Sequence, residues 1–279
     1  MSCQVPYVVN SKIGEQIGTL SFTENVSELI EGNLNIKSEV GLILPTYCEA
    51  ANIRKLVEEI ENLNLSISIL VIDDSSPDGT IDILRNMQEK YGNILLLVRP
   101  KKLGLGTAIT DGFKILISLK NPPKCLITMD ADYSHNPKDI PRLISDLQLG
   151  YDLVIGSRYC KGGNTLNWSI VRLGVSKVAN LVASLIIGAK LCDYTSGMRC
   201  YSISLIRSII GELHSQTYEI QIETIRQAHI QKFKIKEVPI TFANRKKGKS
   251  KLTFNEIKQF VSHIFFKQLL RYAKTPNNA

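Results

Sequence analysis

The sequence predicts an α/β protein in which helices cover both faces of a mostly parallel central sheet. Between residues 40 and 157, short apolar segments alternate with segments of helical spacing. Such alternation is typical of parallel sheets, because each parallel connection needs a crossover, usually a helix. The connections are short, as these units require. With 279 residues, 44% of them hydrophobic and 22% charged, the chain can bury a full core.

The elements follow one another regularly from residue 40. Strands are predicted at 40–45, 67–74, 93–99, 125–130 and 151–157. Helices are predicted at 50–62, from after Asp78 to about 91, at 106–119 and at 137–149. Asp78 can cap the second helix. After residue 158 the pattern changes. A loop rich in Gly and Asn precedes a long helix from about residue 169, a helix at 218–230 and a strand at 234–242.

Three regions are expected along the chain. Residues 1–38 are weakly patterned and are interpreted as a poorly ordered extension with a short helix near 26–31. Residues 39–254 form the α/β domain, and residues 255–279 an amphipathic helix and tail. That helix has basic residues beside an apolar side, so it packs either on the core or against a membrane or partner. No apolar run reaches the roughly 18 residues of a bilayer span, and no secretory signal is visible.

Positive charge is concentrated late in the chain. The net charge is +8, and Arg245, Lys246, Lys247, Lys249 and Lys251 fall within seven residues. Such clusters favour nucleic acid, an anionic membrane or a phosphorylated substrate. Aromatic residues make up only 7% of the chain, and no zinc-finger or RNP-type motif is present, so nucleic acid is disfavoured.

Two aspartates, Asp130 and Asp132, follow the apolar strand that begins at Cys125. Positions i and i+2 lie on one face of a strand, so both carboxylates can converge on one point. Mg²⁺ and Mn²⁺ prefer oxygen ligands, and open α/β sheets bind ligands at the carboxyl ends of their strands. The pair therefore predicts a divalent cation that bridges a diphosphate. The alternative is an ordinary polar strand end with a helix cap.

Two other strand ends supply groups that suit a nucleotide. Asp74 can accept the hydrogen bond of a base N–H, and Tyr47 and Ile72 can form a flat apolar wall. A metal on Asp132 would neutralise the diphosphate. Glu49 and Asp74 can instead be helix caps, which is the simpler interpretation of either residue alone.

Six motifs occur in an order that resembles a known family: PTYCE, VIDDSSPDGT, GLGTA, MDADYSHNP, IGSRYCKGG and GKSKL. They are similar to the inverting family 2 glycosyltransferases of the GT-A fold, and within these to the polyprenyl-phosphate mannosyltransferases. The resemblance covers roughly residues 40–255. The GSRY and KGG segments, Trp168, Arg172 and the segment from Arg245 to GKSKL carry the closer similarity.

The resemblance implies roles at the donor site. Asp132 binds Mg²⁺ or Mn²⁺, and Asp130 lies between sugar, ribose and metal. Some relatives have a glutamine ligand where this chain has Ser134, so water can replace that ligand. The implied donor contacts are Pro45, Tyr47, Glu49, Ile72, Asp74, Asp130, Ala131, Asp132, Arg245 and Lys251.

The resemblance also implies an acceptor-phosphate site of Arg158, Arg172 and Ser176, with Asp132 and Arg158 as the catalytic residues. Arg172 and Ser176 are four residues apart, so on a helix they share a face and can clamp a phosphate. A phosphate monoester is largely dianionic at neutral pH and needs no general base. No His or Glu is an obvious base, although Asp193 and Glu223 stay open as alternatives.

The implied activity is metal-dependent, inverting transfer of mannose from GDP-mannose to dolichyl or polyprenyl phosphate. The implied location is cytoplasmic, peripheral at the cytosolic face of a membrane. Docking, on lipid or on small membrane subunits, would use the terminal helix or residues 178–191. One alternative is transfer of glucose or N-acetylglucosamine from a UDP-sugar to the same acceptor. Another is a noncatalytic, membrane-associated nucleotide-binding module.

Overall fold

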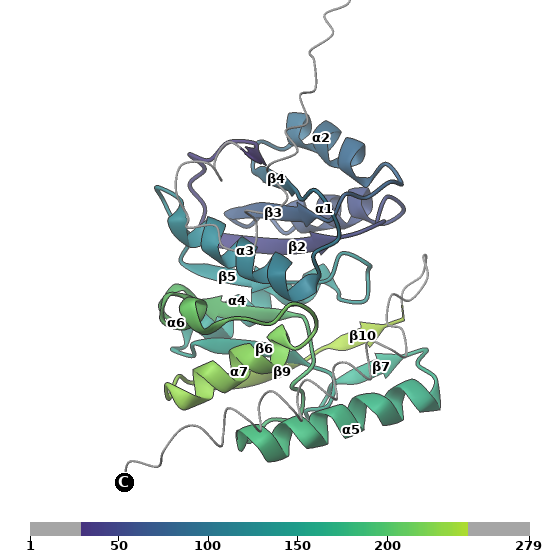
Figure 1. The fold of residues 1–279 in the computed structure, drawn as a ribbon, viewed down its shortest axis with the longest axis vertical. Coiled ribbons are helices and arrows are strands. Elements are labelled where there is room, and N and C mark those ends of the chain that lie inside the picture. The colour runs from purple at the N-terminus through teal and green to yellow at the C-terminus, as the bar shows by residue number, and fades with distance from the viewer. Residues whose placement is uncertain (1–28, 245–279) are drawn as a thin grey trace, which may run out of the picture.

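The computed structural model describes residues 29–244 (Figure 1). Three predicted features lie outside the described residues: Arg245, Lys251 and the helix expected at 255–274.

Within residues 29–244, an eight-stranded sheet forms the centre, in the order β1-β4-β3-β2-β5-β8-β6-β9. Neighbouring strands are parallel, except in the pairs that β1 and β8 make. The prediction of a mostly parallel sheet is thus confirmed. The strands are β1 (Ile30–Glu31), β2 (Val40–Thr46), β3 (Ile67–Asp73), β4 (Ile94–Val98), β5 (Cys125–Thr128), β6 (Leu153–Ser157), β8 (Arg199–Ser202) and β9 (Ile235–Pro239). A second, two-stranded parallel sheet pairs β7 (Asn164–Leu166) with β10 (Thr241–Ala243).

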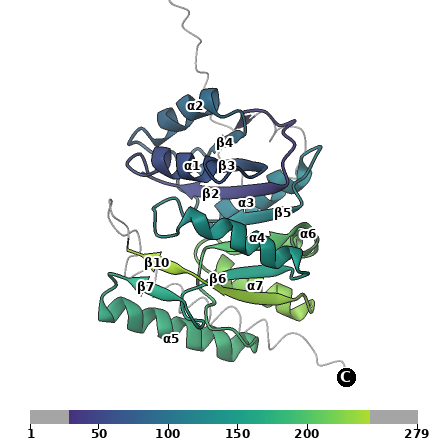
Figure 2. The same ribbon diagram turned by 180° about the vertical axis from the view of Figure 1, so that it is seen from behind.

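Helices cover both faces of the central sheet. The helices are α1 (Ile53–Glu61), α2 (Thr80–Lys90), α3 (Leu105–Ser118), α4 (Ile140–Gln148), α6 (Ile203–Ile209) and α7 (Ile220–Ile230). Helices α3, α6 and α7 lie on one face, and α1, α2 and α4 on the other (Figures 1 and 2). Two buried apolar clusters fill these layers. Neighbouring strand residues divide between them, as Leu42 and Ile43 show, because successive strand side chains point to opposite faces.

The structure differs from the predicted elements in several places. Residues 30–31 form a strand on β4 rather than the end of a helix. The expected strand at 234–242 is two strands, β9 and β10, which belong to different sheets. Strands β7 and β8 and helix α6 were not predicted. Strand β8 begins with the buried Arg199, whose guanidinium donates to the carbonyl oxygens of Tyr194, Ser196 and Gln221. Because a charged residue opens this strand, its sequence lacks the apolar pattern of a core strand.

Helix α5 (Ile170–Ile187) lies at one end of the molecule, beside β7 and β10 (Figures 1 and 2). The sequence predicted no segment of bilayer length. This helix nevertheless has 18 residues and is, by length and composition alone, long and apolar enough to cross a membrane. Its inward side chains Asn180, Ala183 and Ile187 are buried against the domain.

Candidate active site

The polar strand ends meet at one edge of the sheet. Strands β2, β3, β5 and β6 run in the same direction, so their carboxyl ends lie together. Ligands of open α/β sheets bind at this edge. The structure brings to it Pro45, Tyr47, Glu49, Asp74, Asp130, Ala131, Asp132 and Arg158.

The paired aspartates follow β5 on a short loop. Asp132 is buried, and its Oδ1 accepts the backbone N–H of Ser134 at 2.9 Å. The side chain of Asp130 is 35% exposed. A Cβ at Gly197 would lie 3.2 Å from Asp130 Oδ1, so glycine there lets the facing backbone come close to the carboxylate. Among residues 29–244, no group of three His, Cys, Asp or Glu side chains could hold a metal. Two hard carboxylates fit Mg²⁺ or Mn²⁺ if water and substrate complete the shell.

The loop after Asp132 is anchored from two sides. The backbone carbonyl oxygen of Ser134 accepts the backbone N–H of Ala243, on β10, at 3.0 Å. Burial lowers the pKa of His135 to about 4, so its imidazole is neutral near pH 7. The Asp130 N–H donates to His135 Nδ1 at 3.3 Å, which places the ring proton on Nε2. His135 is therefore a positioning group beneath the aspartates.

Asp74 is held by a buried ion pair. Its Oδ1 accepts from Arg99 Nε at 2.6 Å, and its Oδ2 accepts the backbone N–H groups of Leu103 and Gly104 at 3.2 and 3.3 Å. Arg99 also donates to Thr107 at 2.8 Å. The Gly-containing loop before α3 is thus tied to the end of β3. A base N–H would have to share a carboxylate that is already engaged.

The other predicted donor contacts divide into two groups. Tyr47 is half-buried, with the Lys102 ammonium 5.0 Å from its ring centroid. Glu49 is buried and accepts from Asn52 Nδ2 at 2.9 Å, so it also holds the start of α1. Ile72 is only 1% exposed and packs in the core. Its side chain therefore supports the edge from below, and a contact with the nucleotide stays a prediction.

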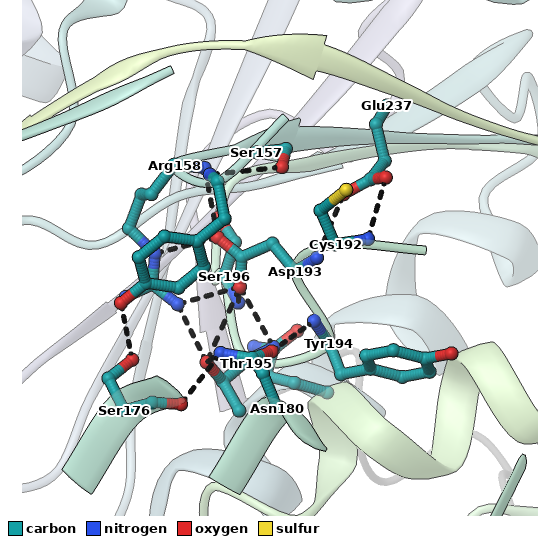
Figure 3. Close-up of polar contacts among 12 residues, drawn as sticks. Ser157, Arg158, Ser176, Asn180, Cys192, Asp193, Tyr194, Thr195, Ser196 and Glu237 are labelled. Carbon is teal, nitrogen blue, oxygen red and sulfur yellow. Dashed lines mark hydrogen bonds and ion pairs between the residues drawn. The ribbon is translucent and has the colours of Figure 1, made fainter. Parts of the chain in front are cut away.

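Arg158, directly after β6, is bound to Asp193. Its Nε and Nη2 donate to the two carboxylate oxygens, each at 2.7 Å, and its backbone N–H donates to Asp193 Oδ2 at 2.9 Å (Figure 3). Burial disfavours the Asp193 carboxylate, but the charge and hydrogen bonds of Arg158 outweigh this and lower its pKa below the ordinary value. Asp193 is therefore an ionised, ion-paired group and is not suited to be a general base.

The loop that carries Asp193 is fixed by its neighbours. The backbone N–H groups of Thr195 and Ser196 donate to Asp193 Oδ1, each at 3.1 Å. The Glu237 carboxylate, on β9, accepts the N–H groups of Cys192 and Asp193, each at 2.8 Å (Figure 3). The carboxylate that binds Arg158 is therefore itself held in place by backbone hydrogen bonds.

Glu223, the other open candidate for a base, has a structural role. Its Oε2 accepts the backbone N–H of His214 at 3.1 Å and that of Ser215 at 2.9 Å. The carboxylate thus holds the loop before α7.

Arg172 and Ser176 on α5 join Arg158 through two aromatic side chains. Tyr159 donates its hydroxyl proton to Ser176 Oγ at 2.7 Å. The Arg172 guanidinium lies 4.0 Å from the Trp168 ring centroid, and that of Arg158 lies 5.4 Å from it. The three predicted acceptor residues are thus brought together, around aromatic rings that suit guanidinium groups.

Two buried donors in this region, Trp168 Nε1 and His135 Nε2, lack an acceptor among residues 29–244. Both rings contact the ring of Phe242, at centroid distances of 5.4 and 4.9 Å respectively, and the Arg158 guanidinium lies 5.4 Å from the same centroid. A buried donor without an acceptor costs free energy. This cationic, donor-rich cluster of side chains around Phe242, which we call the pocket, therefore suits an anionic oxygen ligand.

Sequence reasoning missed several residues that build the pocket. Tyr159, Glu237 and Phe242 were not singled out, and Asp193 was considered only as a base. One local signal was available: Thr195 and Ser196 follow Asp193 at the spacing of a turn in which an aspartate accepts nearby backbone N–H groups.

The fold and the paired carboxylates at its strand ends define a glycosyltransferase of the GT-A fold. The chain belongs to glycosyl transferase family 2, because the sequence profile of that family matches residues 42–210. It is 36% identical over 220 residues to polyprenol monophosphomannose synthase of Mycolicibacterium smegmatis, which covers 78% of this chain and 82% of that protein. It is 35% identical over 224 residues to undecaprenyl-phosphate mannosyltransferase of Micrococcus luteus, and this match covers 80% of this chain and 90% of that protein.

Solved structures share the fold at low sequence identity. Glucosyl-3-phosphoglycerate synthase of Mycobacterium tuberculosis, in complex with Mn²⁺, UDP and phosphoglyceric acid, superimposes with a TM-score of 0.62 at 16% identity, over 88% of this chain and 82% of that chain. A mannosyltransferase of Pyrobaculum calidifontis, in complex with GDP-mannose and Mn²⁺, superimposes with a TM-score of 0.57 at 12% identity. The match covers 88% of this chain and 67% of that chain.

Proposed function

We propose that this glycosyltransferase moves mannose from GDP-mannose to a polyprenyl phosphate, dolichyl phosphate included, with inversion at the anomeric carbon. The names of the two relatives support the acceptor class and the sugar. The observation that carries the proposal is the pocket around Phe242. There Arg158, Arg172 and two further donors meet beside the Ser176 hydroxyl.

An acceptor phosphate in this pocket needs no deprotonation. Its oxygen attacks the anomeric carbon, the bond from that carbon to the diphosphate breaks, and GDP leaves. Phosphate monoesters are largely dianionic at neutral pH. Asp193, paired with Arg158, orients the guanidinium that meets the phosphate. The residues thus hold charged groups in place before the reaction, and such preorganised positioning and electrostatics lower most of the barrier in reactions of this kind.

The donor half follows from the aspartate pair. Asp130 and Asp132, with Ser134 beside them, would hold Mg²⁺ or Mn²⁺. The ion, when bound, neutralises the diphosphate of the leaving group. Tyr47, Glu49 and Asp74 would contact the nucleotide, and Arg245 and Lys251 stay predictions for the same diphosphate. We further propose a peripheral location at the cytosolic face of a membrane, with small membrane subunits as optional partners.

A donor panel tests the proposal. The full chain is incubated with Mg²⁺ or Mn²⁺, a short prenyl phosphate, and GDP-mannose, UDP-glucose or UDP-N-acetylglucosamine in turn. We expect prenyl-phosphate mannose from GDP-mannose alone. Product from a UDP-sugar only would show that the donor is wrong. Absence of product with every donor, although donor binding is measurable, would favour a noncatalytic nucleotide-binding module.

A further inference from the structure

The outward side of α5 carries an unusual concentration of exposed apolar side chains. Ten large hydrophobic residues are exposed among residues 29–244, and six of them lie on this helix. We call them the outer face of α5: Ile170, Val171, Val175, Val178, Leu181 and Leu185. Ile170 is 89% exposed and Leu185 77%. Scattered exposed apolar residues are normal, but a contiguous row indicates a contact surface.

The opposite side of the same helix is bound to the domain by polar groups. Asn180 donates to Thr195 Oγ1 at 3.2 Å and accepts the Tyr194 N–H at 2.6 Å, and Ser176 accepts from Tyr159 (Figure 3). A helix that crossed a bilayer would have to leave these partners, at the cost of unsatisfied polar groups. The helix therefore suits a position parallel to a surface, with only its outer face in contact.

The charges around this face select the partner. Residues 159–192 contain four cations, Lys161, Arg172, Lys177 and Lys190, and no Asp or Glu. A symmetric contact between two copies brings the same patch against itself, so these cations would repel one another. Anionic phospholipid headgroups attract such a patch instead.

We propose that the outer face of α5 lies in the interfacial plane of an anionic phospholipid membrane, with its apolar side chains among the acyl chains and the flanking lysines at the headgroups. This deepens the proposed function and rests on it for the acceptor. Arg172 and Ser176 each follow a residue of the outer face, Val171 and Val175. The phosphate pocket would then open at headgroup depth, with the attached isoprenoid entering the bilayer.

Vesicle flotation of the full chain tests the surface without any acceptor. The vesicles are phosphatidylcholine, with or without phosphatidylglycerol. We expect Leu181→Gln/Leu185→Gln to weaken binding about 30- to 100-fold, because two partly buried leucine side chains are lost. Lys177→Gln should weaken binding about fivefold on anionic vesicles only. The matched control is Leu149→Gln/Ile230→Gln, which changes two exposed apolar residues elsewhere and should bind like the wild type.

Three outcomes would overturn the proposal. The first is equal flotation of the wild type and the Leu181/Leu185 variant. The second is a wild-type dimer, seen by sedimentation, that this variant dissociates. The third is a selective loss of thermal stability in this variant relative to its control, which would mean that the chain's own segment 245–279 covers the face.

Transfer to a water-soluble prenyl phosphate without vesicles separates this proposal from the function. The Leu181→Gln/Leu185→Gln variant should retain wild-type transfer in that assay. If the wild type itself transfers nothing, the proposed function fails, and the flotation result still decides the membrane surface.

Discussion

The proposed donor half and the proposed acceptor half of the edge are built in different ways. The donor half consists of strand ends: Asp74 directly follows β3, and Asp130 and Asp132 come two and four residues after β5. The acceptor half is assembled from separate segments: the end of β6, helix α5, the loop 192–196 and β10. The position of the aspartate pair depends on local sequence, and the acceptor half depends on tertiary contacts. Substitution of Asp132 should therefore affect mainly catalysis, whereas substitutions in the acceptor half should affect catalysis and stability together.

The largest expected effect is at Asp132. Asp132→Ala should lower transfer by about 1000-fold, because the leaving diphosphate loses its counter-charge. The midpoint of thermal unfolding should change little. Initial rates and thermal unfolding measure the two effects, with Asp82→Ala, an exposed aspartate on α2, as the control. Unimpaired transfer would remove the donor half from the mechanism.

Asp193→Asn should affect both properties. Loss of the buried partner leaves Arg158 as an uncompensated charge and should lower the free energy of unfolding by about 3–5 kcal/mol. The mispositioned guanidinium should reduce transfer by about 100-fold. Denaturant unfolding and initial rates measure these effects. Adding Arg158→Gln should recover part of the stability and none of the activity, since neither charge is then left unpaired. A double variant as unstable as the single one would contradict this account.

The same pair predicts a pH dependence of stability. The folded-state pKa of Asp193 is lowered, so its stabilising contribution is fully present above the unfolded-state value of about 3.9. The contribution is lost as the pH falls through the folded-state pKa. The difference in unfolding free energy between the wild type and Asp193→Asn should therefore shrink in acid. A difference that stays constant between neutral pH and about pH 3 would exclude the ion pair as its source.

The smallest effect is expected at Tyr159. Tyr159→Phe removes one hydrogen bond to Ser176 and should raise the KM for the prenyl phosphate about three- to tenfold. The KM for the sugar nucleotide should not change. Ser176→Ala and the double variant complete a thermodynamic cycle. Strictly additive effects of the two substitutions would show that the two hydroxyls act separately.

This contrast also explains how much the sequence could predict. Strand–helix alternation and the Asp130–Asp132 pair are local patterns, so the parallel sheet and the location of the aspartates were predicted correctly. The antiparallel β8 was missed because Arg199 is a poor signal for a buried strand. Two partners of Arg158, Asp193 and Phe242, lie 35 and 84 positions later in the chain. No local spacing connects such residues.

Strand β10 touches both halves of the site at once. Ala243 donates its N–H to the carbonyl oxygen of Ser134, in the loop after Asp132. Asn244, which follows the strand, donates its N–H to the carbonyl oxygen of Leu166, two residues before Trp168. The ring of Phe242 contacts His135 on one side and Trp168 on the other. Any shift of this strand on donor binding would alter the acceptor pocket. Reciprocity then requires each substrate to change the affinity of the other by the same factor.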